Sequence, residues 1–189
     1  MARITQLQIG RTDGGYVLRL EGRGTALVSP TVFDLVMQLW SAGKTGEEMI
    51  VDLSDCEYLD STMMGCLVGL HRKMNTADSV RFLIAAPINE RSMLFGTTRL
   101  ETIFVFAQRV PVPFEDFVPI EDICLDSLEM GEHMVSAHRA LADTVPEGGD
   151  VFDRIAARLS LELAEKKADA AATAEPDKQG RTDLTEALS

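Results

Sequence analysis

Short strand-like runs alternate with helical apolar stripes along the first half of the chain, and this alternation restricts the fold more than any other feature. Apolar residues recur at helical spacing in 33–40, 61–74 and 89–95. Strands that alternate with helices are typical of α/β domains with a partly parallel sheet. The pattern predicts a mixed sheet of about four or five strands, helices mainly on one face, and a parallel pair between 49–53 and 80–85. The strand-like runs are 4–9, 16–20, 49–53, 80–85 and 102–106.

Charge divides the chain and excludes two classes of partner. The chain has 18 basic and 30 acidic residues and a formal net charge of −12. Nucleic acids and anionic membranes both require clustered Lys and Arg, so neither is an expected partner. Residues 109–144 contain two basic and eight acidic side chains, and this acidic stretch opens with Pro111 and Pro113. Prolines interrupt helices and central strands. We therefore divide the chain into a domain at 1–108, a proline-containing acidic linker at 109–121, a helical hairpin at 122–168 and a disordered tail at 169–189.

The hairpin is predicted from two amphipathic stretches joined by a turn at 146–150. Residues 122–144 and 151–167 each have an incomplete apolar stripe. Most helix stability in proteins comes from packing, so we expect the hairpin to dock on its own domain, on a second copy of the chain or on a partner protein. Self-association through the hairpin is therefore one expected role. An independent hairpin on a flexible tether is the alternative.

Several residue types indicate what the protein does not use. The cysteines Cys56, Cys66 and Cys124 match no zinc spacing and are expected to be buried, reduced thiols. His133 and His138 are five residues apart and do not share a helix face, so they are expected at the surface and not as metal ligands. No catalytic constellation or cofactor motif is present, which predicts a protein that is not an enzyme and has no cofactor or metal. The sequence also lacks a membrane-spanning run and a signal peptide, which predicts a cytoplasmic location without membrane insertion.

A serine stands where a strand gives way to a helix. Residues 50–54 read Ile-Val-Asp-Leu-Ser, Cys56 follows, and residues 58–65 read Tyr-Leu-Asp-Ser-Thr-Met-Met-Gly. A hydroxyl at such a corner is expected to be accessible, and a helix N-terminus tolerates negative charge. A phosphate on Ser61 would add about −1.5 to −2 charges beside Asp60. The alternative is that Asp60 and Ser61 only cap the helix. Asp52 is either a strand-end carboxylate near this corner or a solvated strand residue.

This segment resembles the signature of the STAS family, which includes anti-sigma factor antagonists. The resemblance covers roughly residues 15–107 and extends to a strand ending at Gly22, to Pro87 after a strand, and to apolar residues around 100–104. There are two departures. Met63 replaces the first glycine of the family motif, and Thr25 stands near the position of a frequent acidic residue.

The resemblance implies a bacterial partner-switching protein. In phosphorylated family members the serine after the aspartate accepts the phosphate, which corresponds to Ser61, and Thr62 is the weaker candidate. The implied partners are a serine-kinase-type anti-sigma factor, which phosphorylation releases, and a PP2C-type phosphatase. Two alternatives are an accessory subunit of a membrane transporter ATPase and an adaptor that does not depend on phosphorylation. The predicted partner-binding residues are Arg23, Thr25, Asp60, Ser61, Thr62, Met63 and Met64.

Overall fold

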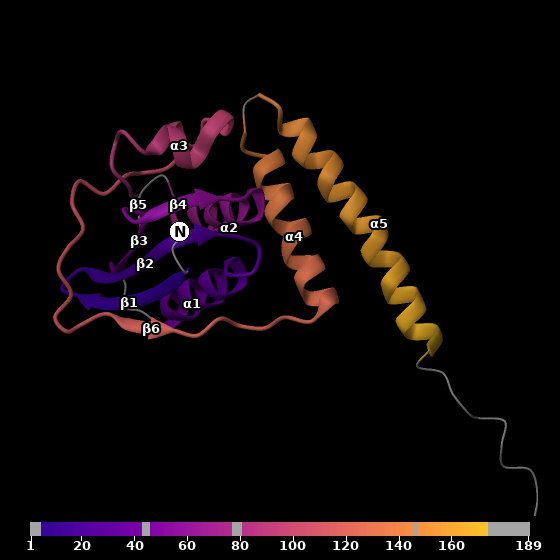
Figure 1. The fold of residues 1–189 in the computed structure, drawn as a ribbon, viewed down its shortest axis with the longest axis horizontal. Helices are drawn as coiled ribbons and strands as arrows, with labels where there is room; N and C mark the ends of the chain where they lie inside the picture. Colours follow the sequence, from indigo (N-terminus) through magenta and orange to yellow (C-terminus); the bar gives the residue numbers. More distant parts are fainter. Residues whose placement is uncertain (1–4, 43–45, 77–80, 146, 174–189) are drawn as a thin grey trace, which may run out of the picture.

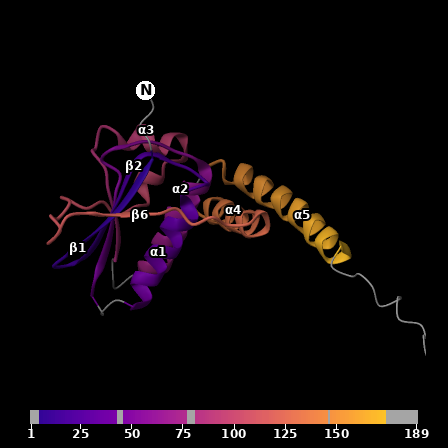
Figure 2. The ribbon, with the colours of Figure 1, turned by 60° about the horizontal axis from the view of Figure 1, so that its bottom comes forward.

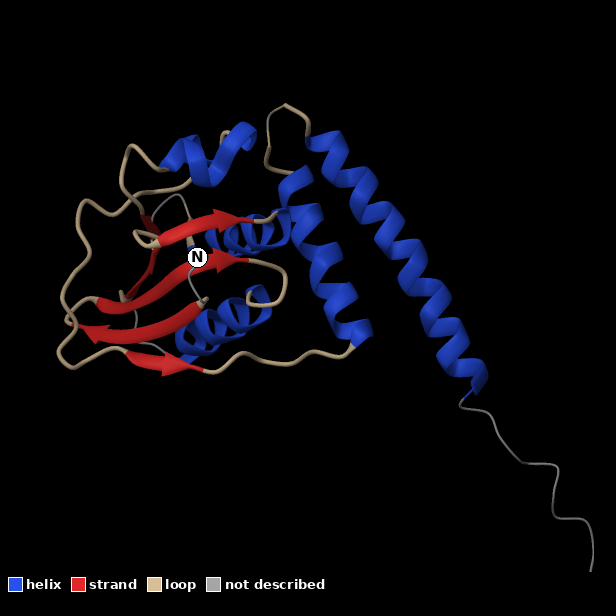
Figure 3. Ribbon diagram, in the orientation of Figure 1, coloured by secondary structure: helices blue, strands red, loops and turns tan. Residues whose placement is uncertain are grey.

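The computed structural model describes residues 5–42, 46–76, 81–145 and 147–173. Figures 1 and 3 show a domain of strands and helices from which two longer helices extend. The strands are β1 (Gln6–Thr12), β2 (Gly15–Gly24), β3 (Glu48–Asp52), β4 (Cys56–Leu59), β5 (Phe82–Ala85) and β6 (Val118–Ile120). The α-helices are α1 (Ser29–Ala42), α2 (Ser61–Met74), α3 (Arg91–Phe95), α4 (Ser127–Ala142) and α5 (Gly149–Thr173). Two short 3-10 helices, η1 (Gly96–Thr98) and η2 (Leu100–Thr102), follow α3.

The sheet is mixed, as the strand–helix alternation predicts. Its strand order is β5-β3-β2-β1-β6, and β4 pairs with β2 beside this path. β1 and β2 form an antiparallel hairpin, whereas β2–β3 and β3–β5 are parallel pairs. The register places Val51 opposite Ile84, so the predicted parallel pair between 49–53 and 80–85 is confirmed.

The two faces of the sheet are covered differently. Alternate residues of the strands, such as Leu18 and Val51, join α1 and α2 in the main core. Val17 and Ile50 point to the other face, where the segment after α3 covers them with Val110 and Phe117. Figure 2 shows α1 and α2 on one side of the strands. This layered α/β arrangement confirms the predicted fold class and presents the first turns of α1 and α2 toward α4.

The predicted strand at 102–106 is wrong. Residues 100–102 form η2, and the amides of Ile103 and Phe104 donate to the carbonyl of Leu100. These local bonds use donors that a strand would offer to a neighbour. Only an isolated bridge between Ile84 and Phe106 joins this segment to β5. Instead, β6 and β4, which the sequence patterns did not predict, complete the sheet, and β6 lies within the stretch assigned to the linker.

The two C-terminal helices are present, and α4 lies against the domain. α4 packs on α2, and α5 packs chiefly on α4 (Figure 1). Leu141 is completely buried and belongs to the main core. α5 continues to Thr173, past the predicted start of the disordered tail at 169, and residues 174–189 lie outside the described residues. Of the three expected docking partners, the structure shows the chain's own domain.

Candidate functional site

Asp60 caps α2 and also fixes the loop that precedes α1. One carboxylate oxygen accepts the amide of Met63 at 2.8 Å, which satisfies one of the free donors of the first helical turn. The other carboxylate oxygen accepts the amide of Ala26 at 2.8 Å. The Asp60 amide donates to the carbonyl of Gly24 at 2.9 Å. The beginnings of α1 and α2 are therefore tied together by one side chain.

Ser61 is the first residue of α2, and its hydroxyl contacts a histidine from α4. The distance between Ser61 Oγ and His138 Nε2 is 3.0 Å. His138 Nδ1 lies 2.7 Å from the carbonyl oxygen of Met134. Because a carbonyl oxygen accepts only, Nδ1 carries a proton, and in a neutral ring Nε2 accepts the Ser61 hydroxyl. Ser61 is half-buried, and so the expected accessible serine is partly covered by α4.

A second histidine of α4 makes the same kind of contact with α1. His133 Nε2 lies 2.8 Å from Oγ of Ser29, the first residue of α1. Burial lowers the pKa of His133, and the nearby Asp34 partly opposes this effect. The expectation of two surface histidines is wrong, because His138 is only 3% exposed and His133 is half-buried. Their separation of five residues allows α4 to contact two different helices.

Gly65 is where α4 crosses α2 at close range. A Cβ atom at residue 65 would lie 2.9 Å from Ala137 Cα and closer still to the carbonyl group of Ala137. Gly69 lies on the same helix, and a Cβ atom there would meet nothing within 4 Å. The absence of a side chain at residue 65 therefore permits the crossing.

The predicted partner-binding residues separate into surface and core positions. Arg23 is exposed and its guanidinium lies 4.4 Å from the centre of the Tyr58 ring. Thr25 and Met64 are half-buried. Thr62 is buried, and Met63 is fully buried against the main core. Met63 therefore fills space beneath the corner, and the expectation that it faces a partner does not fit this burial.

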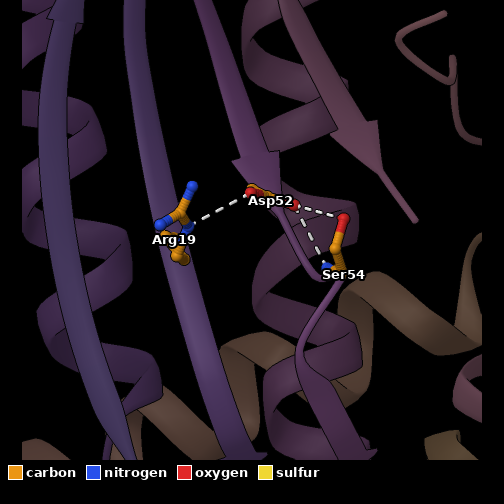
Figure 4. A network of polar contacts seen from close by, with 3 residues as sticks. All are labelled: Arg19, Asp52 and Ser54. Atoms are coloured by element: carbon orange, nitrogen blue, oxygen red, sulfur yellow. Dashed lines mark hydrogen bonds and ion pairs between the residues drawn. The ribbon is translucent and has the colours of Figure 1, made fainter. Parts of the chain in front are cut away.

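Asp52 lies on the opposite face of the sheet from α1 and α2. Its carboxylate is 3.3 Å from Nε of Arg19 and accepts bonds from both the amide and the hydroxyl of Ser54 (Figure 4). The Arg19 guanidinium also lies 3.9 Å from the centre of the Phe117 ring. Asp52 is 3% exposed, so it is not a solvated strand residue. This network joins β2, β3 and the segment before β6.

The thiols differ in burial. Cys56 and Cys66 are buried and Cys124 is exposed, so the expectation of three buried thiols is wrong for Cys124. Burial raises the pKa of Cys56 and that of Cys66. Within the described ranges, no group of three or more potential ligands is arranged to hold a metal ion. No helix among the described residues is long and apolar enough to cross a membrane.

Comparison with known proteins finds similar solved structures but no matching family model. No family model matches the chain, and no curated protein matches it. The solved structures that match include an anti-sigma factor antagonist from Mycobacterium paratuberculosis, with a TM-score of 0.47 and 17% sequence identity. That match covers 57% of this chain and 88% of the other.

Sequence reasoning found part of this site. It placed Ser61 at the start of a helix and left a cap as one interpretation of Asp60, but it did not find Ser29, His133 or His138 as contacts. Ser61 and His138 are 77 residues apart, and no local pattern connects them. The available signals were a glycine at position 65 in a predicted helix and the two histidines in the hairpin.

Proposed function

We propose that this protein is a partner-switching regulator of the anti-sigma factor antagonist type, and that phosphorylation of Ser61 controls its binding to a kinase-type anti-sigma factor. The observation that carries the proposal is the position of the Ser61 hydroxyl. It begins a capped helix, at a corner where another helix already packs. A group attached there alters whatever packs on that corner.

A phosphate at Ser61 would act through charge. The kinase would transfer the terminal phosphoryl group of ATP to Ser61 Oγ, with ADP leaving and the hydroxyl proton passing to a base of the kinase. The product carries about −1.5 to −2 charges next to the Asp60 carboxylate. The free N–H groups of the first turn would tolerate this charge within the helix. A partner packed on the corner would have to pair it or leave it desolvated, and a cost of about 3 kcal/mol lowers affinity about a hundredfold. A PP2C-type phosphatase would restore binding by hydrolysing the phosphate ester.

The test is capture of partners from the native host by the full chain. Ser61→Ala should retain the kinase-type partner, and Ser61→Asp should retain much less of it. Ser92→Asp is the matched control, because Ser92 is an exposed serine of α3 and receives the same charge away from the corner. Mass spectrometry of the protein isolated from cells should find phosphate on Ser61. Equal capture by all three variants, with no phosphate on Ser61, would reject the proposal.

Two alternative functions predict different results in the same experiment. An accessory subunit of a transporter ATPase would capture that ATPase whether or not Ser61 is charged. An adaptor independent of phosphorylation would capture its partner equally with Ser61→Ala and Ser61→Asp. The position of Ser61 as the first residue of a capped helix, where added negative charge is tolerated, supports the phosphorylation-controlled function.

A further inference from the structure

We propose that the N-terminal halves of α1 and α2 form a helix-binding surface, that α4 occupies this surface as an intramolecular ligand, and that the partner binds by displacing α4 with an amphipathic helix of its own. This inference rests on the proposed function, because it names the surface on which the partner binds. It goes further in assigning the role of the hairpin, which is to compete with the partner.

α4 contacts the same corner of the domain, around Ser61, on which we propose that the partner binds. His138 bonds to the first residue of α2 and His133 to the first residue of α1. Ala137 supplies the small side chain that lets the two backbones approach at Gly65. Leu141, four residues later, adds a fully buried apolar side chain. A partner helix that replaces α4 therefore needs a small residue at its crossing point, a hydrogen-bonding side chain opposite Ser61 and an apolar residue one turn further on.

Outside this surface the segment around α4 has further contacts with the domain, because Val145, which follows α4, is buried in the main core and Phe152 of α5 packs against that core. The residues from Glu121 to Cys124 that lead into it are exposed, and the amide of Ile123 donates to Thr31 Oγ1 of α1 at 2.8 Å. The ion pair between Arg72 and Asp143 is solvent-exposed and contributes little. A groove of about 330 Å³, lined in part by Phe33, Lys73 and Glu129, remains between α4 and the two helices beneath it. α5 packs chiefly on α4, so displacement of α4 would carry α5 with it and would also remove Val145 and Phe152 from the main core.

Competition gives the hairpin a measurable effect on affinity. If α4 occupied the surface 99% of the time, the apparent affinity of the partner would be about a hundredfold below its intrinsic affinity. A variant that opens the hairpin should recover this difference.

The first experiment weakens the docking of α4 on the domain by a substitution within α4. Leu141→Asp places a charge at the fully buried position of α4, whereas Leu161→Asp makes the same change at an exposed position of α5. Both are made in a full chain with Ser61→Cys, and labelling of the introduced thiol by a maleimide is located by peptide mass spectrometry. Labelling at residue 61 should be at least about tenfold faster with Leu141→Asp than with Leu161→Asp, equal to about 1.4 kcal/mol of lost docking free energy.

Amide hydrogen exchange tests whether the domain of the substituted protein is still folded. Slow hydrogen exchange in β3 shows that the sheet remains folded, since β3 lies between two neighbours in the sheet. If Leu141→Asp loses this protection, Leu141→Ala replaces it as a milder opening change. Equal labelling in both arms with β3 protected would overturn the proposal.

The second experiment tests the surface with a defined probe. The probe is a fluorescent peptide of residues 126–143, which carries α4 and its capping box. It should bind the Leu141→Asp protein at least about tenfold more tightly than the Leu161→Asp protein, in which α4 still occupies the surface. Adding Gly65→Ala to the Leu141→Asp protein should abolish binding, because a Cβ atom there overlaps Ala137 of the probe. Gly69→Ala is the matched control and should leave binding unchanged. Binding that is insensitive to Gly65→Ala would overturn the proposed surface.

Capture from the host then separates the two proposals. Both the proposed function and the competition are supported if Leu141→Asp captures more of the kinase-type partner than wild type does and if the added peptide reduces this capture. Capture that depends on Ser61 but is equal for Leu141→Asp and wild type overturns the competition and leaves the proposed function standing. If the peptide binds but capture of the partner does not depend on Ser61, the proposed function is overturned. The helix-binding surface is then still supported by the binding of the peptide.

Discussion

Asp60 and Asp52 show how far single residues can be read from the sequence. Asp52 ends a strand and Asp60 follows one, and the structure shows Asp60 as a helix cap, which the sequence offered as one of two interpretations. For Asp52 it left two interpretations open, because its partner Arg19 is 33 residues away and pairs with it only through the register of β2 and β3. Local spacing predicts caps, whereas cross-strand partners depend on a register that the sequence does not state.

The Asp52 ion pair should matter more for stability than an exposed one. We expect Asp52→Ala to lower the free energy of unfolding by about 2–3 kcal/mol, because it leaves Arg19 without its carboxylate and Ser54 without its acceptor. Asp143→Ala removes an exposed pair with Arg72 and should cost less than about 1 kcal/mol. Urea unfolding followed by the fluorescence of Trp40 measures both. Equal losses in the two variants would contradict the assignment of Asp52 as a structural carboxylate.

Helices and most strands were predicted from periodicity, while β4 and β6 were not. The apolar stripe of α2 and the run at β3 have the expected bounds within about a residue or two. The run at 102–106 has strand-like composition but contains only the end of η2 and a single bridge, because the amides of Ile103 and Phe104 bond locally to the carbonyl of Leu100. β6 contains Pro119 and has two exposed residues of three, so it lacks the apolar alternation that identifies a strand.

The two hairpin helices should differ in local stability. α4 has four buried residues and packs on α2. Among the residues of α5 whose burial is described, one is buried, Ala156. We therefore expect amide hydrogen exchange to be slowest in β3, intermediate in α4 and fastest in the C-terminal half of α5. Exchange measured by mass spectrometry on peptic fragments provides this order. Protection of α5 equal to that of β3 would show that α5 is held by contacts beyond α4, as in self-association.

At the scale of the whole molecule, the sequence predicted an α/β domain followed by two helices but not where those helices dock. The expected docking partners included the chain's own domain, and the deciding features are a glycine of α2 and two histidines of α4, of which one is buried and one is half-buried. The docking position of α4 depends on the close approach of two backbones, which the apolar stripes alone do not predict. The same approach brings titratable side chains into the contact between hairpin and domain.

The whole chain should therefore lose stability in mild acid. Burial lowers the pKa of His71 and of His133 below the ordinary value of 6.5. His71 Nδ1 accepts from Asn75 at 2.9 Å, and His133 contacts Ser29, with the charge of Asp34 only partly favouring protonation. Well above pH 6.5 both histidines are mostly neutral in the folded and in the unfolded chain. Below it the unfolded chain takes up protons first, so the free energy of unfolding falls as pH falls.

The measurement is urea unfolding at pH 7.5, 6.5 and 5.5. The midpoint should decrease toward pH 5.5, and the double variant His71→Gln, His133→Gln should show a smaller decrease, because Gln has no proton to gain in this range. Each single variant locates the effect, since His71 lies in α2 within the domain and His133 lies at the contact between α4 and α1. A wild-type midpoint that is constant or rises between pH 7.5 and 5.5 would contradict the lowered pKa values and the burial from which they follow.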